Sequence, residues 1–277
     1  MKKLVAVSFA AFLLFSGFSQ VRAAEVVIPE INNVTDLHKY TITDQKEDLK
    51  LRSDGTLDIS KVNFEGIDPR LVNEYEEVVI SVNEEVENGI VKFTADFEVV
   101  VATEEELIEL SERSESSELE FSNRIMPMAD PDEPRSFSLE NRVYTNLEEL
   151  QTKERGFEQA AKLNPTINPW LSTATFFAVQ VRPGGPWDYK REIGWNNLRT
   201  VKVNGTKYYL TGEDIGNIHY GFVGRDHFSK KTLLSAAGMV QILVGTARLE
   251  WFDSYFDDPT DQAAIARGIT WYETGDF

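Results

Sequence analysis

Apolar residues recur at intervals of three and four positions between Leu71 and Val86, with charged and amide side chains between them. This spacing places the apolar residues on one face of an α-helix. Asp68 followed by Pro69 is typical of a helix start, because aspartate caps free backbone N–H groups and proline fits the first turn. The pattern therefore predicts an amphipathic helix that begins at Pro69 and ends before Gly89.

The pattern then changes to alternation. From Val91 to Val101 every second residue is apolar, and most of the residues between them are polar. This period of two predicts one half-buried strand. Thr103 and Glu106 have the spacing of a capping box, in which each side chain bonds the backbone of the other residue. A short helix is therefore expected to about Leu110.

The second half of the chain opens with a helical pattern from Leu147 to Leu163, for which Asn146 is the predicted cap. The apolar segment from Leu171 to Val181 suits either a helix or a strand, because a continuous apolar run has no diagnostic period. Two prolines and two glycines in residues 182–186 predict an irregular loop after it.

Residues 201–210 carry the strongest hairpin signal, because Asn204-Gly205 tolerates the positive φ angles of a tight turn between two strands. Ser229 is the predicted cap of a long helix over residues 229–252. A last helix is expected from residues 258–260 to about residue 272. Together these patterns predict a mainly helical α+β domain with one β-hairpin.

Serine, glutamate and proline dominate residues 111–137, which we interpret as a flexible linker because this composition buries little apolar surface. The linker would separate a small α+β module, residues 24–110, from a domain of residues 138–277. The first part is strongly acidic. Residues 25–138 hold 10 Lys and Arg against 29 Asp and Glu, whereas residues 139–277 hold 15 against 17.

The first residues have the pattern of an export signal. Two lysines precede an apolar run from Leu4 to Phe18, and Val21 and Ala23 have the spacing that precedes a signal-peptidase site. We therefore predict that residues 1–23 are removed and that the protein is secreted. The run is shorter than the roughly 20 residues of a membrane span, so no membrane anchor is expected. The chain has no cysteine, and we expect a monomer without disulfides.

The candidate chemistry centres on His219, one of three histidines in the chain, which lies five positions after Asp214. An imidazole exchanges protons near neutral pH, and a carboxylate can orient it. We interpret Gly216 to Gly221 as a loop whose backbone approaches a ligand, with Asn217 and Tyr220 as hydrogen-bonding groups. The alternative is a tight turn in which the rings of His219 and Tyr220 only pack.

Other acidic residues have weaker signals. Asp188 and Lys190 form either a plain ion pair on a loop or the Asp-x-Lys end of a metal-dependent nuclease motif. Asp257, Asp258 and Asp261 are interpreted as acids at a helix start rather than as a cation site.

We expect no bound metal and no cofactor. The sequence lacks a glycine-rich phosphate loop and a nucleophile-elbow serine, which disfavours nucleotide hydrolysis and serine-esterase chemistry.

Three segments, in this order, resemble the polymorphic toxin type 44 domain: Trp187-Asp188-Tyr189-Lys190 after a Gly-Pro loop, Asp214 to Gly221 ahead of Ala236-Ala237-Gly238, and Asp257 to Gln262 ahead of Gly268 and Tyr272. The resemblance covers only the C-terminal domain. It implies a toxin module used in competition between bacteria and neutralised by an immunity protein. The signal peptide and the small acidic N-terminal half differ from the much larger exported proteins that usually carry this module.

From these observations we expect a catalytic group and a substrate-binding group in the C-terminal domain. The expected catalytic residues are Asp188, Lys190, Asp214 and His219, and the expected substrate contacts are Asn217, Tyr220, Trp187, Gly216, Gly221, Asp261 and Gln262. Aromatic side chains could also face a saccharide, although ordinary core packing is the better explanation for them. This aromatic set is Trp187, Trp195, Tyr208, Tyr209 and Tyr220.

The function that we favour is an exported hydrolase that acts on the bacterial envelope, with peptidoglycan as the preferred polymer. Export by the chain's own signal supports this hypothesis. The first alternative is a nuclease toxin, which cleaves RNA or DNA. The charge of residues 139–277 counts against it, because nucleic-acid binding usually depends on a basic surface. The second alternative is a secreted interaction protein without enzymatic activity.

Overall fold

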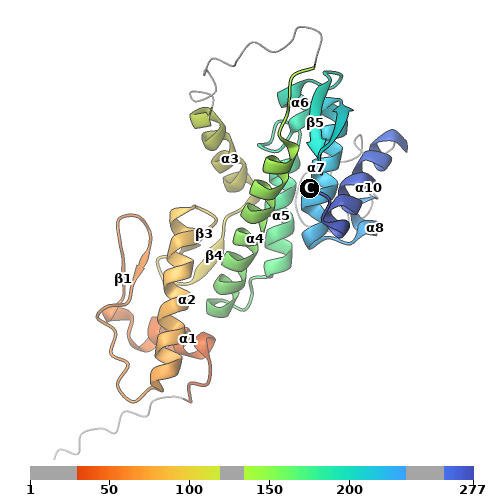
Figure 1. Ribbon diagram of the computed structural model, residues 1–277. Helices are drawn as coiled ribbons and strands as arrows, with labels where there is room; N and C mark the ends of the chain where they lie inside the picture. The colour runs from red at the N-terminus through yellow and green to blue at the C-terminus, as the bar shows by residue number, and fades with distance from the viewer. Residues whose placement is uncertain (1–29, 119–133, 235–258) are drawn as a thin grey trace, which may run out of the picture. The chain divides into compact units, whose positions relative to one another are not determined.

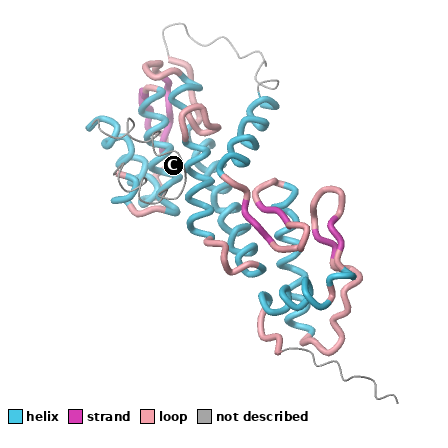
Figure 2. The backbone as a smooth tube through the Cα atoms, turned by 180° about the vertical axis from the view of Figure 1, so that it is seen from behind, coloured by secondary structure: helices cyan, strands magenta, loops and turns pink. Residues whose placement is uncertain are grey.

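The computed structural model describes residues 30–118, 134–234 and 259–277. Several predictions fall outside the described residues: the signal peptide, the middle of the linker, Asp257 and Asp258, and residues 235–252 of the long helix. The described part is mainly helical, with three two-stranded antiparallel sheets, as Figure 2 shows in cyan and magenta. This confirms the predicted fold class, a mainly helical α+β protein.

The elements appear in Figure 1 in chain order. The helices are α1 (Val34–Asp44), the short 3-10 helix η1 (Lys46–Asp48), α2 (Pro69–Glu87), α3 (Glu104–Glu118), α4 (Leu139–Leu163), α5 (Pro169–Val181), α6 (Tyr189–Ile193), α7 (Gly212–His227), α8 (Lys230–Leu233) and α10 (Pro259–Thr274). The strand pairs are β1 (Lys50–Leu51) with β2 (Leu57–Asp58), β3 (Val91–Phe93) with β4 (Val99–Val101), and β5 (Arg199–Val203) with β6 (Thr206–Leu210).

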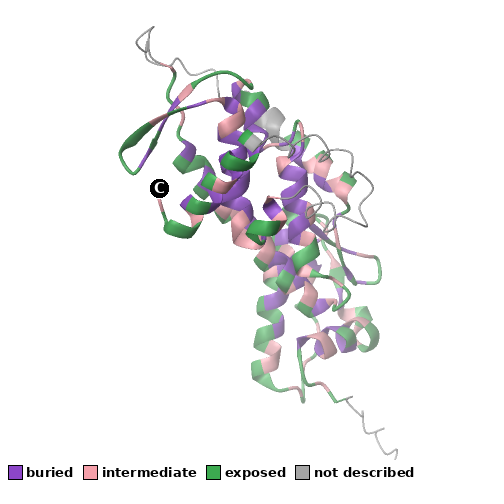
Figure 3. Ribbon diagram, turned by 90° about the vertical axis from the view of Figure 1, so that its right-hand side faces the viewer, coloured by how far each residue is buried: buried purple, intermediate pink, exposed green. Residues whose placement is uncertain are grey.

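Helix α2 forms as the hydrophobic pattern predicts. The side chain of Asp68 accepts a hydrogen bond from the backbone N–H of Arg70, and Pro69 occupies the first turn. Tyr75 and Val82 lie on the apolar face and are fully buried. Figure 3 shows a similar division into buried and exposed faces in other helices, whereas α7 is buried on every side from Ile215 to Gly224. Burial of one apolar stripe is therefore what holds these amphipathic helices in place.

The single strand predicted from Val91 to Val101 is wrong. These residues form the hairpin of β3 and β4, in which Val91 pairs with Val101 and Phe93 pairs with Val99. Phe97 turns the chain with a φ of 63°, and its N–H donates to the carbonyl of Thr94. Alternation has the same period in one strand or in two, so the pattern alone could not reveal the reversal.

Helix α3 begins with the predicted capping box. Thr103 N–H donates to Oε2 of Glu106, and the N–H of Glu106 donates to Oγ1 of Thr103. The expected end near Leu110 is wrong, because α3 continues to Glu118. The start of the segment that we interpreted as a linker is therefore helical.

Helix α4 begins earlier than predicted. It starts at Leu139 after the N-cap residue Ser138, so Asn146 lies about two turns inside the helix and is not its cap. The side chain of Asn146 is buried, and it bonds Tyr189 and His219 in the core. The neighbouring segment, whose type the sequence left open, is the helix α5, and Asn168 caps its first turn.

The hairpin of β5 and β6 has the predicted turn. Asn204 and Gly205 adopt φ angles of 46° and 75°, and Val203 pairs with Thr206 on either side of them.

Ser229 caps a helix as expected, but this helix, α8, ends at Leu233. The last helix, α10, begins at Pro259, which confirms its predicted start.

Helices α7 and α10 pack closely against each other, as Figure 1 shows. A methyl group at Gly221 would lie 2.2 Å from the carbonyl oxygen of Ile265, and one at Gly268 would lie 2.0 Å from that of Ile218. No side chain fits such a gap. The glycines on both helices therefore allow the two backbones to approach directly.

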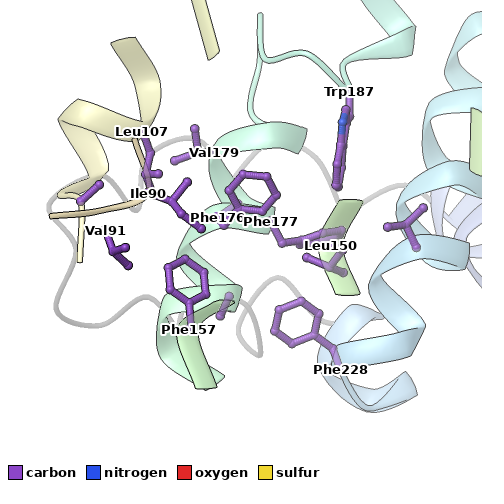
Figure 4. Packing of buried hydrophobic residues seen from close by; sticks show 14 of the residues in the cluster. Ile90, Val91, Leu107, Leu150, Phe157, Phe176, Phe177, Val179, Trp187 and Phe228 are labelled. Atoms are coloured by element: carbon purple, nitrogen blue, oxygen red, sulfur yellow. The ribbon is translucent and has the colours of Figure 1, made fainter. Parts of the chain in front are cut away.

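The residues before and after the predicted linker contact each other within the unit Ile31–Phe277. Glu85 of α2 pairs with Lys153 of α4 at 3.3 Å, and both side chains are mostly buried. Arg182 pairs with Glu112 of α3 at 3.2 Å. Figure 4 shows apolar packing between the same elements, with Leu107 of α3 near Val179 of α5. The boundaries drawn at either end of the linker stay a prediction.

Candidate functional site

Helix α6 carries two of the expected catalytic residues. Asp188 is its N-cap residue and is almost fully buried. Its Oδ2 accepts a hydrogen bond of 2.8 Å from the backbone N–H of Gly184 and pairs with Nε of Arg191 at 3.2 Å. These contacts stabilise the loop that leads into α6. Asp188 therefore fixes the start of the short helix on which Lys190 lies.

Lys190 is buried against α7. A methyl group at Gly216 would lie 2.7 Å from Cγ of Lys190, so the lysine stem crosses α7 where that helix has no side chain. Its Nζ lies 5.3 Å from the ring centroid of Trp195. Burial lowers the pKa of Lys190, while the carboxylates of Asp261 and Glu213 oppose this effect. Nζ is thus a buried amine with acidic neighbours.

Asp261 and Asn217 join the same region from two other helices. Nδ2 of Asn217, on α7, donates a hydrogen bond of 2.6 Å to Oδ1 of Asp261, in the first turn of α10. The two residues are 3% and 9% exposed. A buried carboxylate needs such a partner, because an unpaired one is strongly disfavoured. We call Lys190, Gly216, Asn217 and Asp261 the Lys190 cluster.

The Lys190 cluster brings together four of the residues expected from the sequence, from three different helices. A lysine whose pKa is lowered by burial gives up its proton more readily than an exposed lysine, which makes Lys190 a candidate for proton transfer. A neighbouring carboxylate can stabilise the ammonium form when it arises. The cluster therefore has the components of an acid–base centre.

A second group surrounds His219. Nδ2 of Asn146 donates to Oη of Tyr189 at 2.8 Å and lies 2.8 Å from Nε2 of His219. An amide nitrogen cannot accept a hydrogen bond, so Nε2 of His219 is the acceptor and the imidazole proton is on Nδ1. The edge of Trp187 packs against the same imidazole, with ring centroids 5.6 Å apart. We call Asn146, Trp187, Tyr189 and His219 the His219 cluster.

The imidazole of His219 is neutral and fully buried. Burial lowers its pKa from 6.5 to about 3, and the positive charge of Arg142 acts in the same direction. Nδ1 has no hydrogen-bond partner among the described residues. In this conformation His219 holds the side chain of Asn146, which in turn holds the phenol of Tyr189.

The interpretation of Gly216 to Gly221 as a ligand-binding loop is wrong, and so is the alternative of a tight turn. The whole segment lies inside α7. The alternative was correct in one respect, because the rings of His219 and Tyr220 pack in the core. The glycines made the segment look irregular, whereas Gly216 makes room for Lys190 and Gly221 for the backbone of α10.

The remaining expected site residues lie elsewhere. Asp214 completes a capping box at the start of α7, where its Oδ2 accepts hydrogen bonds from N–H and Oγ1 of Thr211. Tyr220 is buried, packs on Phe177, and has its pKa raised by burial. Gln262 is exposed on α10. Within the described part of the chain, no hydrogen bond joins Asp188 with Asp214; each carboxylate bonds residues near it in the sequence.

Sequence reasoning missed Asn146 and Tyr189 as members of a site. Asn146 has the residue type of a helix cap, and only its contacts with Tyr189 and His219 reveal its position in the core. Tyr189 lies inside the segment that resembles the toxin family, so that signal could have identified it. Among the aromatic residues considered for saccharide contact, Trp195 and Tyr209 are exposed, at 43% and 56%, and Trp187 is buried.

A comparison with known protein families matches the C-terminal part of the chain. Residues 176–274 match the family described as bacterial toxin 44. This range contains the three segments on which the resemblance rests, and it contains the Lys190 cluster. The resemblance seen in the sequence is thereby confirmed for the C-terminal part of the chain, and the match supports a bacterial toxin. No curated protein and no solved structure matches the chain significantly.

Two further findings concern the described residues alone. They contain no group of three or more histidine, aspartate or glutamate side chains arranged to hold a metal ion. Among the helices of the same ranges, none is both long and apolar enough to cross a membrane.

Proposed function

We propose that this protein is an exported toxin whose C-terminal domain hydrolyses a polymer of the bacterial cell envelope, with peptidoglycan as the substrate. One observation carries the proposal, the convergence of Lys190, Asn217 and Asp261 within the part of the chain that matches the toxin family. A buried amine beside a fixed carboxylate suits general acid–base hydrolysis.

In the proposed reaction, neutral Nζ of Lys190 takes a proton from a water molecule as the water oxygen bonds to the scissile carbon. The ammonium of Lys190 then returns this proton to the leaving group as the scissile bond breaks. The carboxylate of Asp261 stabilises the ammonium between these two steps, and Asn217 holds that carboxylate in place. Gly216 keeps the lysine stem free of a neighbouring side chain.

The choice of an envelope polymer rests on two further features. Trp195 is 43% exposed and lies beside Nζ of Lys190, where its ring offers an apolar face to a sugar or a peptide. Residues 139–277 hold 15 Lys and Arg against 17 Asp and Glu, so this part of the chain has no excess of positive charge with which to bind phosphates. The predicted signal peptide would deliver the protein to the envelope.

The test is a substrate comparison. The chain from Ala24 onward is incubated with purified peptidoglycan and, separately, with total RNA. We expect soluble fragments from peptidoglycan, identified by chromatography and mass spectrometry, and intact RNA. Cleavage of RNA with intact peptidoglycan would replace this proposal with the nuclease hypothesis. If neither substrate changes while the protein is folded by circular dichroism, the hydrolase proposal is wrong.

As a toxin, the protein would require an immunity protein in the producing cells. A partner that protects the producer should block the enzymatic site, so it should cover Lys190 or the exposed Trp195 beside it. Co-purification with the product of a neighbouring gene, followed by loss of the complex in Trp195→Ala, tests this part of the proposal. A partner that binds Trp195→Ala as tightly as the original chain would contradict it.

A further inference from the structure

A cavity of about 630 Å³ lies beside the His219 cluster and apart from the Lys190 cluster. Its walls come from α3, α4, α5, the start of α6 with the loop before it, and the segment between α2 and β3. The lining residues used below are Leu107, Asn141, Arg142, Asn146, Lys153, Phe176, Gln180, Trp187 and Tyr189. Pockets of about 300 to 1,000 Å³ are typical of sites for small organic ligands. The volume of this cavity lies within that range.

The cationic side chains on the cavity wall already have partners within the protein. Arg142 pairs with Glu192 at 3.4 Å, and Lys153 pairs with Glu85 at 3.3 Å. A ligand that relied on either cation would have to compete with these carboxylates. The cavity is therefore better suited to a neutral ligand than to a phosphate or an acidic peptide.

Two amides in the wall retain hydrogen-bonding capacity. Gln180 is 6% exposed, and its side-chain amide forms no hydrogen bond with any described residue. Asn146 is also 6% exposed, and both of its hydrogen bonds use Nδ2, so its Oδ1 has no partner within the described ranges. Because Gln180 and Asn146 line the cavity, a ligand inside it can form hydrogen bonds with these amide groups.

Aromatic side chains form another part of the wall. Phe176 and Trp187 pack edge to face with centroids 6.1 Å apart, and both line the cavity together with Tyr189. Aromatic carbon surface next to free amides matches the chemistry of a sugar ring, which has apolar C–H faces and a rim of hydroxyl or acetamido groups. Neither an aliphatic ligand nor an ion would use both features.

We propose that this cavity binds a neutral saccharide that carries N-acetyl groups, with the amides of Gln180 and Asn146 as its hydrogen-bonding partners. The saccharide would come from the glycan of the cell envelope, and this part of the inference rests on the proposed function. It assigns binding to the cavity and leaves bond cleavage to the Lys190 cluster. It also gives α3 a role, because Leu107 closes one side of the cavity.

The test measures binding of N,N′-diacetylchitobiose to the chain from Ala24 onward by isothermal titration calorimetry. Cellobiose, which has the same ring linkage without N-acetyl groups, is the matched ligand. We expect binding of the acetylated disaccharide, with cellobiose at least about tenfold weaker. Failure of the folded protein to bind the acetylated disaccharide, or equal binding of the two, would overturn the inference.

Variants then locate the site. Gln180→Leu keeps the side-chain volume and removes the amide, and we expect about tenfold weaker binding. Gln151→Leu makes the same change on α4 outside the cavity and should leave binding unchanged. Asn141→Ala, at the exposed rim of the cavity, should also weaken binding and provides a second test if Gln180→Leu does not fold. Unchanged binding in a folded Gln180→Leu would overturn the assignment. If Gln180→Leu does not fold, unchanged binding in Asn141→Ala would overturn it.

Lys190→Met separates this inference from the proposed function. We expect this variant to bind the disaccharide as the original chain does, because Lys190 does not line the cavity. If the original chain binds the disaccharide but does not cleave peptidoglycan, the cavity assignment stands and the proposed function fails. If the original chain cleaves peptidoglycan without binding the disaccharide, the proposed function stands and the cavity assignment fails.

Discussion

Asn217 donates a hydrogen bond of 2.6 Å to Asp261, and this bond joins the middle of α7 to the first turn of α10. Both residues are buried, so the carboxylate of Asp261 depends on protein groups rather than on water for its stabilisation. The same carboxylate acts on the pKa of Lys190. One hydrogen bond thus links the packing of two helices to the electrostatics of the proposed site.

Asn217→Leu should destabilise the fold. The substitution leaves Oδ1 of Asp261 buried without this partner, at a cost of about 1 to 3 kcal/mol in the free energy of unfolding. Urea unfolding measures the change. The double variant Asn217→Leu with Asp261→Leu removes both polar groups and should recover part of the loss. A single variant as stable as the original chain would contradict the role of this bond.

Gly221→Ala and Gly268→Ala should each destabilise the protein by about 2 kcal/mol or more, because the new methyl group would collide with the backbone of the facing helix. The direction of the change in stability distinguishes close backbone packing from helix propensity. Alanine is intrinsically the better helix former by about 1 kcal/mol, so without the close contact both substitutions would stabilise the protein. Thermal unfolding of the two variants, compared with Ala263→Gly on the exposed face of α10, decides between these outcomes.

The fold should lose stability as the pH falls from about 6.5 toward 4. Burial lowers the pKa of His219 to about 3 and that of His38 to about 4, whereas the unfolded chain protonates both near 6.5. In this window the unfolded chain therefore binds protons that the folded chain excludes, and each histidine contributes a loss of about 1 kcal/mol per pH unit.

Urea unfolding at pH 7 and pH 5 measures this dependence. His219→Gln should lose less stability between the two pH values than the original chain, and the double variant with His38→Gln should lose less still. Comparison of variants at the same two pH values cancels the contribution of the many carboxylates. An identical loss in all three proteins would show that neither histidine is buried in its neutral form.

Some of the site could be predicted from the sequence, and its arrangement could not. Lys190, Asn217 and Asp261 were singled out by residue type and by the family resemblance, but their convergence depends on how α7 and α10 cross. Gly216 and Gly221 favoured a loop because glycine is a poor helix former. Close packing against Lys190 and Ile265 outweighs that propensity, and no local pattern reveals such tertiary contacts.

The proposed division of the chain can be tested by limited proteolysis. The composition of residues 111–137 leads us to expect the first cuts there, with a fragment of about residues 138–277. The buried pair of Glu85 with Lys153 crosses this boundary, so the two fragments should remain together in gel filtration after the cut. First cuts within residues 138–277, or fragments that separate in native buffer, would contradict this expectation.

The most direct test of the proposed site is the rate at which Lys190→Met releases soluble fragments from peptidoglycan. Lys202→Met, at an exposed position of β5, makes the same chemical change away from the site and serves as the control. We expect Lys190→Met to lose activity by about a hundredfold or more, the typical contribution of a general acid–base group, and Lys202→Met to keep it. A folded Lys190→Met that cleaves peptidoglycan at the rate of Lys202→Met would show that the Lys190 cluster is not the catalytic site.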